Sequence, residues 1–432
     1  MKNMLKPIFT SLIYCSAALT FPAFGEDLID IYKQALTNDP TYQAARYDHM
    51  AVLELRPQAK ATLRPQVDLS ANAAWNEIEN DTMSVFDSQG YSLTLVQALY
   101  NQPAFAAVNQ VDLAIAQSEA ALESALNSLM LRASEAYFNI ISAHDELEFA
   151  VSELNAIERQ LEQAEKRFEV GLSAVTDVKE AQARYDLAVA QKIAATNRLA
   201  QAEEALKTLT NQDYQKLSPL KEDMSFLPPN PEDINYWVAL AEKNNRRYLS
   251  AQYATQSAEE EIKLQKGFHY PTLSLVGSHS DTQSDNPLVE SRRTALMLQL
   301  DVELYSGGST SSKVREAEAK LMAAQRNQEL QRRLVLQQTR NAYLGVIADI
   351  SRVKALKQAL ISTQAGADAT QAGFDVGTRT AVEVLVALRE TFRAQADYSK
   401  ARYAYILNSL RLKEGAGSLT AADLEEINTW LQ

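Results

Sequence analysis

The chain has 432 residues with a formal net charge of −13 at pH 7, and only 13 glycines and 12 prolines. This acidic balance, without a long basic run, excludes nucleic acid as a partner, because phosphate binding needs a concentrated basic face. Ala, Leu, Gln, Glu, Lys and Arg are concentrated in residues 103–211 and 313–414, a composition that is typical of long helices.

The first 25 residues are predicted to be a secretory signal peptide. Lys2 and Lys6 precede an apolar stretch, and Ala23-Phe24-Gly25 forms a small-x-small cleavage site, so Glu26 is the expected mature N-terminus. The only cysteine, Cys15, lies inside this segment, and Tyr14 before it disfavours a lipoprotein. No later segment offers roughly 18 consecutive apolar residues, which excludes a transmembrane helix. Three destinations remain open: the periplasm, the medium, or a membrane crossed by β-strands.

The rest of the chain is predicted to be a tandem duplication. A shift of 206 residues (374 − 168 = 206) places Phe168-Glu169-Val170-Gly171 on Phe374-Asp375-Val376-Gly377, and Asn38 and Tyr42 on Asn244 and Tyr248. A constant spacing over nearly the whole chain indicates two copies of one unit. We therefore expect a first repeat at 26–211, an equatorial linker at 212–235, a second repeat at 236–415 and a C-terminal equatorial tail at 416–432.

Each repeat is expected to begin with a helix, the first at 27–60, followed by two amphipathic strands. Apolar and polar residues alternate in four segments, 67–75, 91–95, 271–282 and 293–305. One reading is a half-buried sheet in a soluble domain. Strands of about ten residues also suit a membrane-spanning sheet, in which Asp301 and Glu303 would face a water-filled lumen.

A four-stranded membrane sheet requires oligomerisation, because lipid tolerates no unpaired strand edge. Two copies would supply eight strands (2 × 4), a barrel that its own side chains fill. Three copies would supply twelve (3 × 4) and leave a wet passage. The sequence supports oligomerisation more firmly than the number three.

Long helical hairpins are expected to complete each repeat. Residues 103–168 contain no internal glycine and only Pro103 at their start, so a continuous helix would be about 100 Å long. Their apolar residues recur with the coiled-coil period. The chain is expected to reverse at Gly171 and Gly377 into helices at 174–211 and 380–414. Twelve such helices in a trimer could form a tube, and a solid periplasmic coiled coil is the alternative.

The stretches 167–178 and 372–385, together with Leu304-Tyr305-Ser306-Gly307-Gly308, resemble the tip motifs and the strand-to-helix turn of the TolC family of outer membrane efflux proteins. The resemblance covers residues 27–432. It implies a mainly α fold with β-strands: a homotrimer whose 12-stranded outer-membrane β-barrel continues into a 12-helix periplasmic α-barrel. It also implies an exit duct for drugs, toxic compounds or unfolded proteins in tripartite efflux and type I secretion. The implied partners are a periplasmic adaptor protein, an inner-membrane pump of the RND, ABC or MFS type, and outer-membrane lipid.

The same resemblance assigns a gate. It places Asp177 and Arg379 as linking residues, Thr176 as a second acceptor for the arginine, and Glu383 as a pore-facing carboxylate whose pKa like charges in a trimer would raise. A solvated helix-end pair is the alternative for Asp177 and Arg379.

Two positions depart from the family pattern. Phe374 replaces a linking tyrosine, and Val386 replaces a second pore carboxylate. These departures lead to the hypothesis of a closed tip that is more weakly linked and less cation-selective than in the family.

The turns Val170-Gly171-Leu172 and Val376-Gly377-Thr378 resemble the family's adaptor-docking tips. The glycines could equally serve only the helix reversal, which needs a positive φ.

No catalytic motif and no cofactor or metal site is predicted. The four histidines are scattered, and Ser306-Gly307-Gly308 is not followed by the Gly-Lys-Ser/Thr of a phosphate-binding loop. A periplasmic adaptor and a secreted hydrolase remain as competing classes. Neither explains both the paired strands and the two hairpins. The sequence leaves the transported substrate open.

Overall fold

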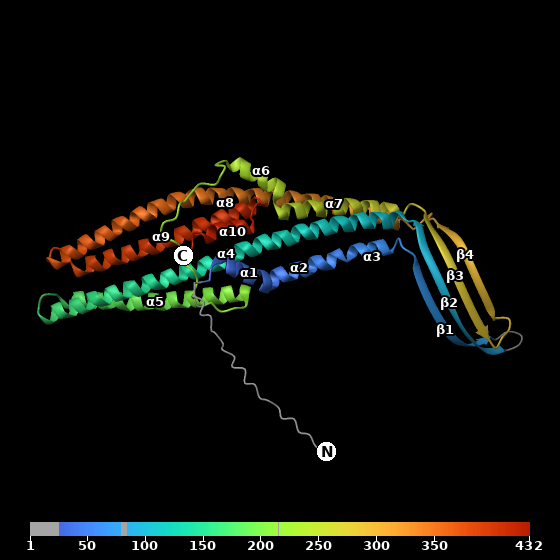
Figure 1. Cartoon of the computed structure of the whole chain (residues 1–432), viewed down its shortest axis with the longest axis horizontal. Helices are drawn as coiled ribbons and strands as arrows, with labels where there is room; N and C mark the ends of the chain where they lie inside the picture. Colours follow the sequence, from blue (N-terminus) through green and yellow to red (C-terminus); the bar gives the residue numbers. More distant parts are fainter. Residues whose placement is uncertain (1–25, 79–83, 215) are drawn as a thin grey trace, which may run out of the picture.

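The computed structural model describes residues 26–78, 84–214 and 216–432, so the predicted signal peptide lies outside the described residues. The molecule is elongated, with a β-sheet at one end and the turns of two long helical hairpins at the other (Figure 1). Helices and strands follow each other in the same order in both halves: short helices, two strands, and a long hairpin. The expected fold class, mainly α with β-strands and an internal duplication, is confirmed.

Three short helices replace the single helix that was expected over residues 27–60. They are α1 (Leu28–Asn38), α2 (Pro40–Leu53) and α3 (Leu55–Ala61). The prediction missed the break at Asp39, whose backbone is extended. Pro40 causes it, because a proline disfavours helical backbone in the residue before it and fits the first position of a new helix.

The four strands form one antiparallel sheet in the order β1-β2-β3-β4. They are β1 (Gln66–Ile78), β2 (Ser84–Tyr100), β3 (Thr272–Ser284) and β4 (Ser291–Asp301). β4 is shorter than the expected segment 293–305. Glu303 instead accepts a hydrogen bond from the Thr310 hydroxyl at 2.9 Å, where the chain turns toward α8. β1 and β4 are the two outer strands of the sheet.

The register places apolar residues on one face of the sheet. Leu69 pairs with Leu93, and Leu275 pairs with Leu298. Most intervening pairs are polar, for example Ser70 with Ser92, and Val276 with Met297 is an apolar exception. In the single chain the apolar face is open, and Leu298 is 68% exposed. The sheet therefore has one oily and one polar face, as the alternation predicts.

Long helices extend from the sheet. α4 (Gln102–Glu169) and α8 (Ser309–Asp375) contain 68 and 67 residues, or about 100 Å each. They reverse into α5 (Val175–Thr210) and α9 (Ala381–Gly415). The remaining helices are α6 (Ile234–Asn244), α7 (Arg246–Gly267) and α10 (Ala421–Asn428). In the described part of the chain, every helix is too short or too polar to cross a membrane.

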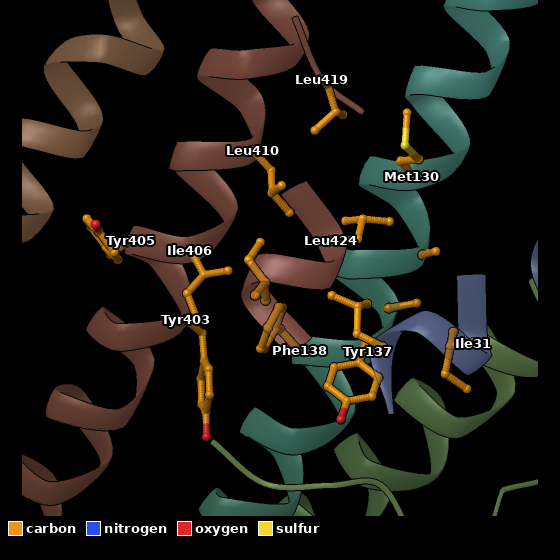
Figure 2. Packing of buried hydrophobic residues seen from close by; sticks show 14 of the residues in the cluster. Ile31, Met130, Tyr137, Phe138, Tyr403, Tyr405, Ile406, Leu410, Leu419 and Leu424 are labelled. Carbon is orange, nitrogen blue, oxygen red and sulfur yellow. The ribbon is translucent and has the colours of Figure 1, made fainter. Parts of the chain in front are cut away.

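The main hydrophobic core lies halfway along the molecule, where α1, α4, α9 and α10 meet (Figure 2). Phe138 of α4 contacts Tyr137 edge-on at 5.4 Å and stacks on Tyr403 of α9 at 5.8 Å between ring centroids. The linker joins this region through a bridge between Leu220 and Leu431. This core holds the two hairpins together at the ends that lie farthest from their turns. From there the hairpins extend side by side toward their turns.

A bidentate ion pair ties the N-terminal helices to α4. Both Asp39 carboxylate oxygens accept hydrogen bonds from Arg132, at 3.1 and 2.6 Å, and one also caps α2 through the Tyr42 N–H. Asp39 is 2% exposed. Burial raises the pKa of Asp39, but the bonds from Arg132, Tyr42 and Thr41 outweigh burial and lower it.

We predict that Asp39→Asn lowers the free energy of unfolding by about 2–3 kcal/mol, because the Arg132 charge loses its buried partner. The loss is expected at neutral pH and shrinks in acid. The depressed pKa means that the wild-type contribution is fully present above the ordinary value of Asp and is lost as the pH falls through the lower folded value. Denaturant titrations from pH 7 to 3 measure it, with the exposed Asp48→Asn as control. Equal stability of the two variants at pH 7 would contradict the prediction.

Candidate gate and docking tip

Both hairpins reverse through the same type of glycine turn. Gly171 has φ +77° and Gly377 has φ +81°. The turns close with Leu172 N–H donating to Arg167 O at 2.8 Å, and Thr378 N–H donating to Gly373 O at 2.8 Å. These bonds satisfy helix-end carbonyls, and a left-handed residue makes them possible. The repeated turn explains why both copies keep glycine here.

The predicted docking residues all lie in these two turns and are exposed. Leu172 is 74% and Val376 is 75% exposed, with Val170 nearly as open. Aliphatic side chains this open at the end of a long hairpin form a small apolar surface. Thr378 is also exposed, and its hydroxyl donates to Gly373 O at 2.9 Å. We call Val170–Leu172 and Val376–Thr378 the two tips.

Asp177 lies in the first turn of α5, where its carboxylate caps the helix. It accepts from the Ser173 hydroxyl at 3.1 Å and from the Ala174 N–H at 3.3 Å. Thr176 beside it is exposed. An acidic residue in this position also faces the positive end of the helix dipole.

Arg379 and Glu383 form an ion pair within the second hairpin, 2.8 Å between Nη1 and Oε1. Glu383 also accepts from the Thr380 N–H at 2.8 Å and from its hydroxyl at 3.0 Å. The Thr380 N–H and then Arg379 and the Thr380 hydroxyl hold the pKa of Glu383 below its ordinary value. Within one chain the predicted Asp177–Arg379 link is not formed. A link between copies, and a pKa rise from a ring of carboxylates, stay predictions.

Phe374 occupies a buried position between the hairpins and is 6% exposed. The Arg167 guanidinium lies over its ring, 4.5 Å from the centroid. Further from the turns, Gln160 donates a 2.9 Å hydrogen bond from α4 to Gln371 on α8. Val386, at the second position that departs from the family pattern, is partly exposed. Sequence reasoning missed the Arg167 contact, although Arg167 stands in the tip motif.

A small apolar cluster lies just behind the first tip. Its buried members come from α4, α5 and α9: Ile157, Leu161, Ala164, Ala181, Ala188 and Leu385. Leu385 is the α9 contribution, so the second hairpin packs on the first here. Nearer the middle of the molecule, a cleft of about 520 Å³ separates α5 and α9 above α4. Glu153 lines this cleft, and burial raises its pKa against the effect of Arg389. Sequence reasoning did not find it.

No group of three or more His, Cys, Asp or Glu side chains suited to a metal ion occurs among the residues that the structure describes. The charged side chains at the gate positions instead cap helices or pair with a nearby residue, as Asp177, Arg379 and Glu383 do. These contacts are non-covalent, so they can hold neighbouring helices together and can also break to let them separate.

Comparison with known proteins places the chain among channels. The family model "Outer membrane efflux protein" matches residues 31–212 and again 237–418. The outer membrane protein TolC of Vibrio cholerae is 33% identical over 100% of this chain and 99% of its own length. TolC of Escherichia coli is 31% identical over 94% of this chain and 85% of its own length. The alkaline protease secretion protein AprF of Pseudomonas aeruginosa is 28% identical, over 93% and 87%.

Solved structures share the fold at lower identity. The CmeC outer membrane channel of Campylobacter jejuni superposes with a TM-score of 0.82 at 15% identity, over 94% of this chain and 90% of that one. CusC superposes with a TM-score of 0.81 at 17% identity, over 92% and 94%.

We predict opposite effects for alanine at two glycines of the second hairpin. Gly377→Ala should weaken the turn by about 1 kcal/mol, because a side chain at positive φ is strained even where space is open, as it is here. Gly366→Ala, in the interior of α8 and equally open, should stabilise the helix by about 0.5–1 kcal/mol. Hydrogen exchange of amides at residues 365–385 measures both. Faster exchange in both variants would contradict this account.

Proposed function

Because the chain belongs to the outer membrane efflux protein family, we propose that three copies close into a passive exit duct. The duct would lead from a periplasmic pump complex, through the outer membrane, to the exterior. The single observation that carries the proposal is the sheet. It has one apolar face and two outer strands that are each paired on one edge only, and it continues into helices about 100 Å long.

The order of the elements across the chain supports a ring. In the half of the molecule next to the sheet, α3 and α2 pack on α4, α4 packs on α7, and α7 packs on α8. This sequence parallels β1-β2-β3-β4 in the sheet. Toward the tips, α5 packs on α4, α4 on α9, and α9 on α8. One side of the chain thus carries β1, α2, α3 and α5, and the other carries β4 and α8. Joining opposite sides head to tail pairs β1 with β4 and generates a closed ring.

Exposed apolar residues on these two sides support the same joint. Leu187 and Ile193 of α5 are open on one side, and Leu344 and Ile361 of α8 are open on the other. Exposed leucine and isoleucine side chains on both of these helices are consistent with a contact between copies. Three copies supply twelve strands (3 × 4), enough for a wet passage, and the polar face of the sheet would line it.

The proposed gate lies where the hairpins approach each other near the tips. Asp177 and Thr176 of one copy would meet Arg379 of a neighbour, which would exchange its partner Glu383 for this link. Glu383 would then face the pore as one of three carboxylates. Phe374, which is 6% exposed, would help to close the space between the two hairpins of its own chain.

The apolar tips would dock a periplasmic adaptor protein, which joins the duct to an inner-membrane pump of the RND, ABC or MFS type. The tips are small, exposed and backed by rigid helix ends, as a tip-to-tip contact requires. Relatives are named both for outer membrane efflux and for protease secretion, so drug efflux and type I secretion are both within the proposal. Energy would come from the pump, and the duct itself would catalyse no reaction.

Charging two exposed apolar residues of α8 should dissociate the assembly. We predict that Leu344→Glu with Ile361→Glu increases the monomer fraction at least severalfold, because it buries two charges at the joint. Mass measurement of the detergent-solubilised protein reports the oligomer. Leu227→Glu, an equally exposed leucine in the linker, is the control. A double variant that stays as trimeric as this control would contradict the joint.

Charging the tips should abolish export and spare conduction. We predict that Leu172→Asp with Val376→Asp removes complementation of a deletion strain, measured as resistance to drugs and bile salts and as secreted protein in the medium. Conductance of the purified trimer in planar bilayers should be unchanged, since the tips lie outside the passage. The exposed Lys192→Asp on α5 is the control. Full complementation by the tip variant would count against adaptor docking there.

A further inference from the structure

The last turns of α4 and α8 meet through one aromatic contact. Both helices run toward the tips, where they end at Glu169 and Asp375. Arg167 on α4 places its guanidinium 4.5 Å from the ring centroid of Phe374 on α8. The ring is 6% exposed, so the cation lies over a face that water hardly reaches. Cation–π attraction is strongest where the pair is partly desolvated.

Helix dipoles add to this attraction. Arg167 belongs to the last turn of α4, which also carries Lys166, whereas the last turn of α8 contains no basic residue. The guanidinium therefore lies at the negative ends of two parallel helices. Among the described residues, no carboxylate lies within ion-pair distance of Arg167, so the ring and the helix ends are its main partners there.

The other charged side chains of the gate are satisfied within their own hairpin. Asp177 bonds to Ser173 and Ala174, and Arg379 bonds to Glu383. Arg167 instead reaches across to the second hairpin. The hydrogen bond between Gln160 and Gln371 is the next crossing contact away from the turns. The Arg167 contact is thus the outermost of the described polar contacts between the two hairpins.

We propose that Arg167 and Phe374 form a latch that holds the two hairpins of one chain together and sets how readily the tip opens. Opening the tip by moving one hairpin away from the other exposes the Phe374 ring to water and removes the cation from its face. Both changes raise the free energy of the open arrangement, so the contact favours the closed one. The latch needs no hydroxyl at position 374, so the phenylalanine there is a working part of it. This inference rests on the proposed duct, because a latch matters only if the tip is a gate.

The test compares two variants that remove the same charge from the same helical turn. Arg167→Gln removes the cation over the ring, and Lys166→Gln removes its exposed neighbour. In planar bilayers, Arg167→Gln should raise the ratio of open to closed trimers. Each chain that loses the contact should contribute a factor of roughly two to five. Lys166→Gln should leave the ratio unchanged, and Arg167→Lys should lie between the two, since a lysine keeps the charge without the planar stacking. Equal ratios for Arg167→Gln and Lys166→Gln would overturn the latch.

A double-mutant cycle tests whether the two residues act as a pair. Phe374→Leu keeps an apolar side chain and removes the ring. Combined with Arg167→Gln, it should raise the open-to-closed ratio no further than the larger single effect, because both substitutions remove one interaction. Effects that multiply would refute the pairing. Size-exclusion chromatography of each variant checks that the trimer is intact.

Amide hydrogen exchange at residues 371–377 of the same trimers measures the stability of the latch independently of whether the trimers conduct. Arg167→Gln should accelerate exchange there two- to fivefold, and Lys166→Gln should not. If no variant conducts while exchange responds as expected, the duct fails and the latch stands. If the trimers conduct while exchange and gating ignore Arg167, the latch fails and the duct stands.

Discussion

The backbone hydrogen bonds of two outer strands constrain the rest of this molecule. β1 and β4 each leave one row of N–H and C=O groups without a partner in the sheet, on a sheet whose one face is apolar. In lipid such groups must find protein partners, at several kcal/mol each if they do not. In the proposed ring, pairing β1 of one copy with β4 of the next would resolve both edges at once. Because β1 follows α3 and β4 precedes α8, this joint would also determine which helices of neighbouring copies become adjacent.

The duplication makes that arrangement possible. Each repeat supplies a pair of strands and a helical hairpin, and the two repeats lie side by side in the same orientation. Their long helices α4 and α8 therefore run in the same direction and end together at the tips. The middle of the molecule, around Tyr137, Phe138 and Tyr403, holds the repeats together. Beyond this core each hairpin is mostly free, so the contacts near the tips decide how far apart the hairpins lie.

Two kinds of contact occur near the tips: contacts within one hairpin and contacts between the two hairpins. Capping interactions, such as Asp177 at α5 and Glu383 at α9, stabilise each hairpin by itself. Near the tips, the contacts that the described residues make across the hairpins include the Leu385 cluster, the Gln160–Gln371 hydrogen bond and the Arg167–Phe374 contact. If the tip is the proposed gate, the distance between the hairpins can change while each hairpin stays folded. Few crossing contacts near the tips would also leave a docking partner with little to overcome.

Local patterns in the sequence determined the amphipathic strands, the long helices and the reversals at Gly171 and Gly377. Alternation, coiled-coil spacing and the need for a positive φ all act over a few residues, so one chain displays them directly. The break at Asp39 was missed although Pro40 marks it, because the helical composition on both sides outweighed one residue. Only the tertiary structure decided that Arg167 covers Phe374. The pair between Arg379 and Glu383 is a local contact four residues apart, which the sequence analysis did not draw. Arg167 and Phe374 are 207 residues apart (374 − 167 = 207) and meet because the second hairpin packs on the first through α9, which contacts both α4 and α8. No local pattern encodes that packing, since it depends on how the two repeats lie against each other.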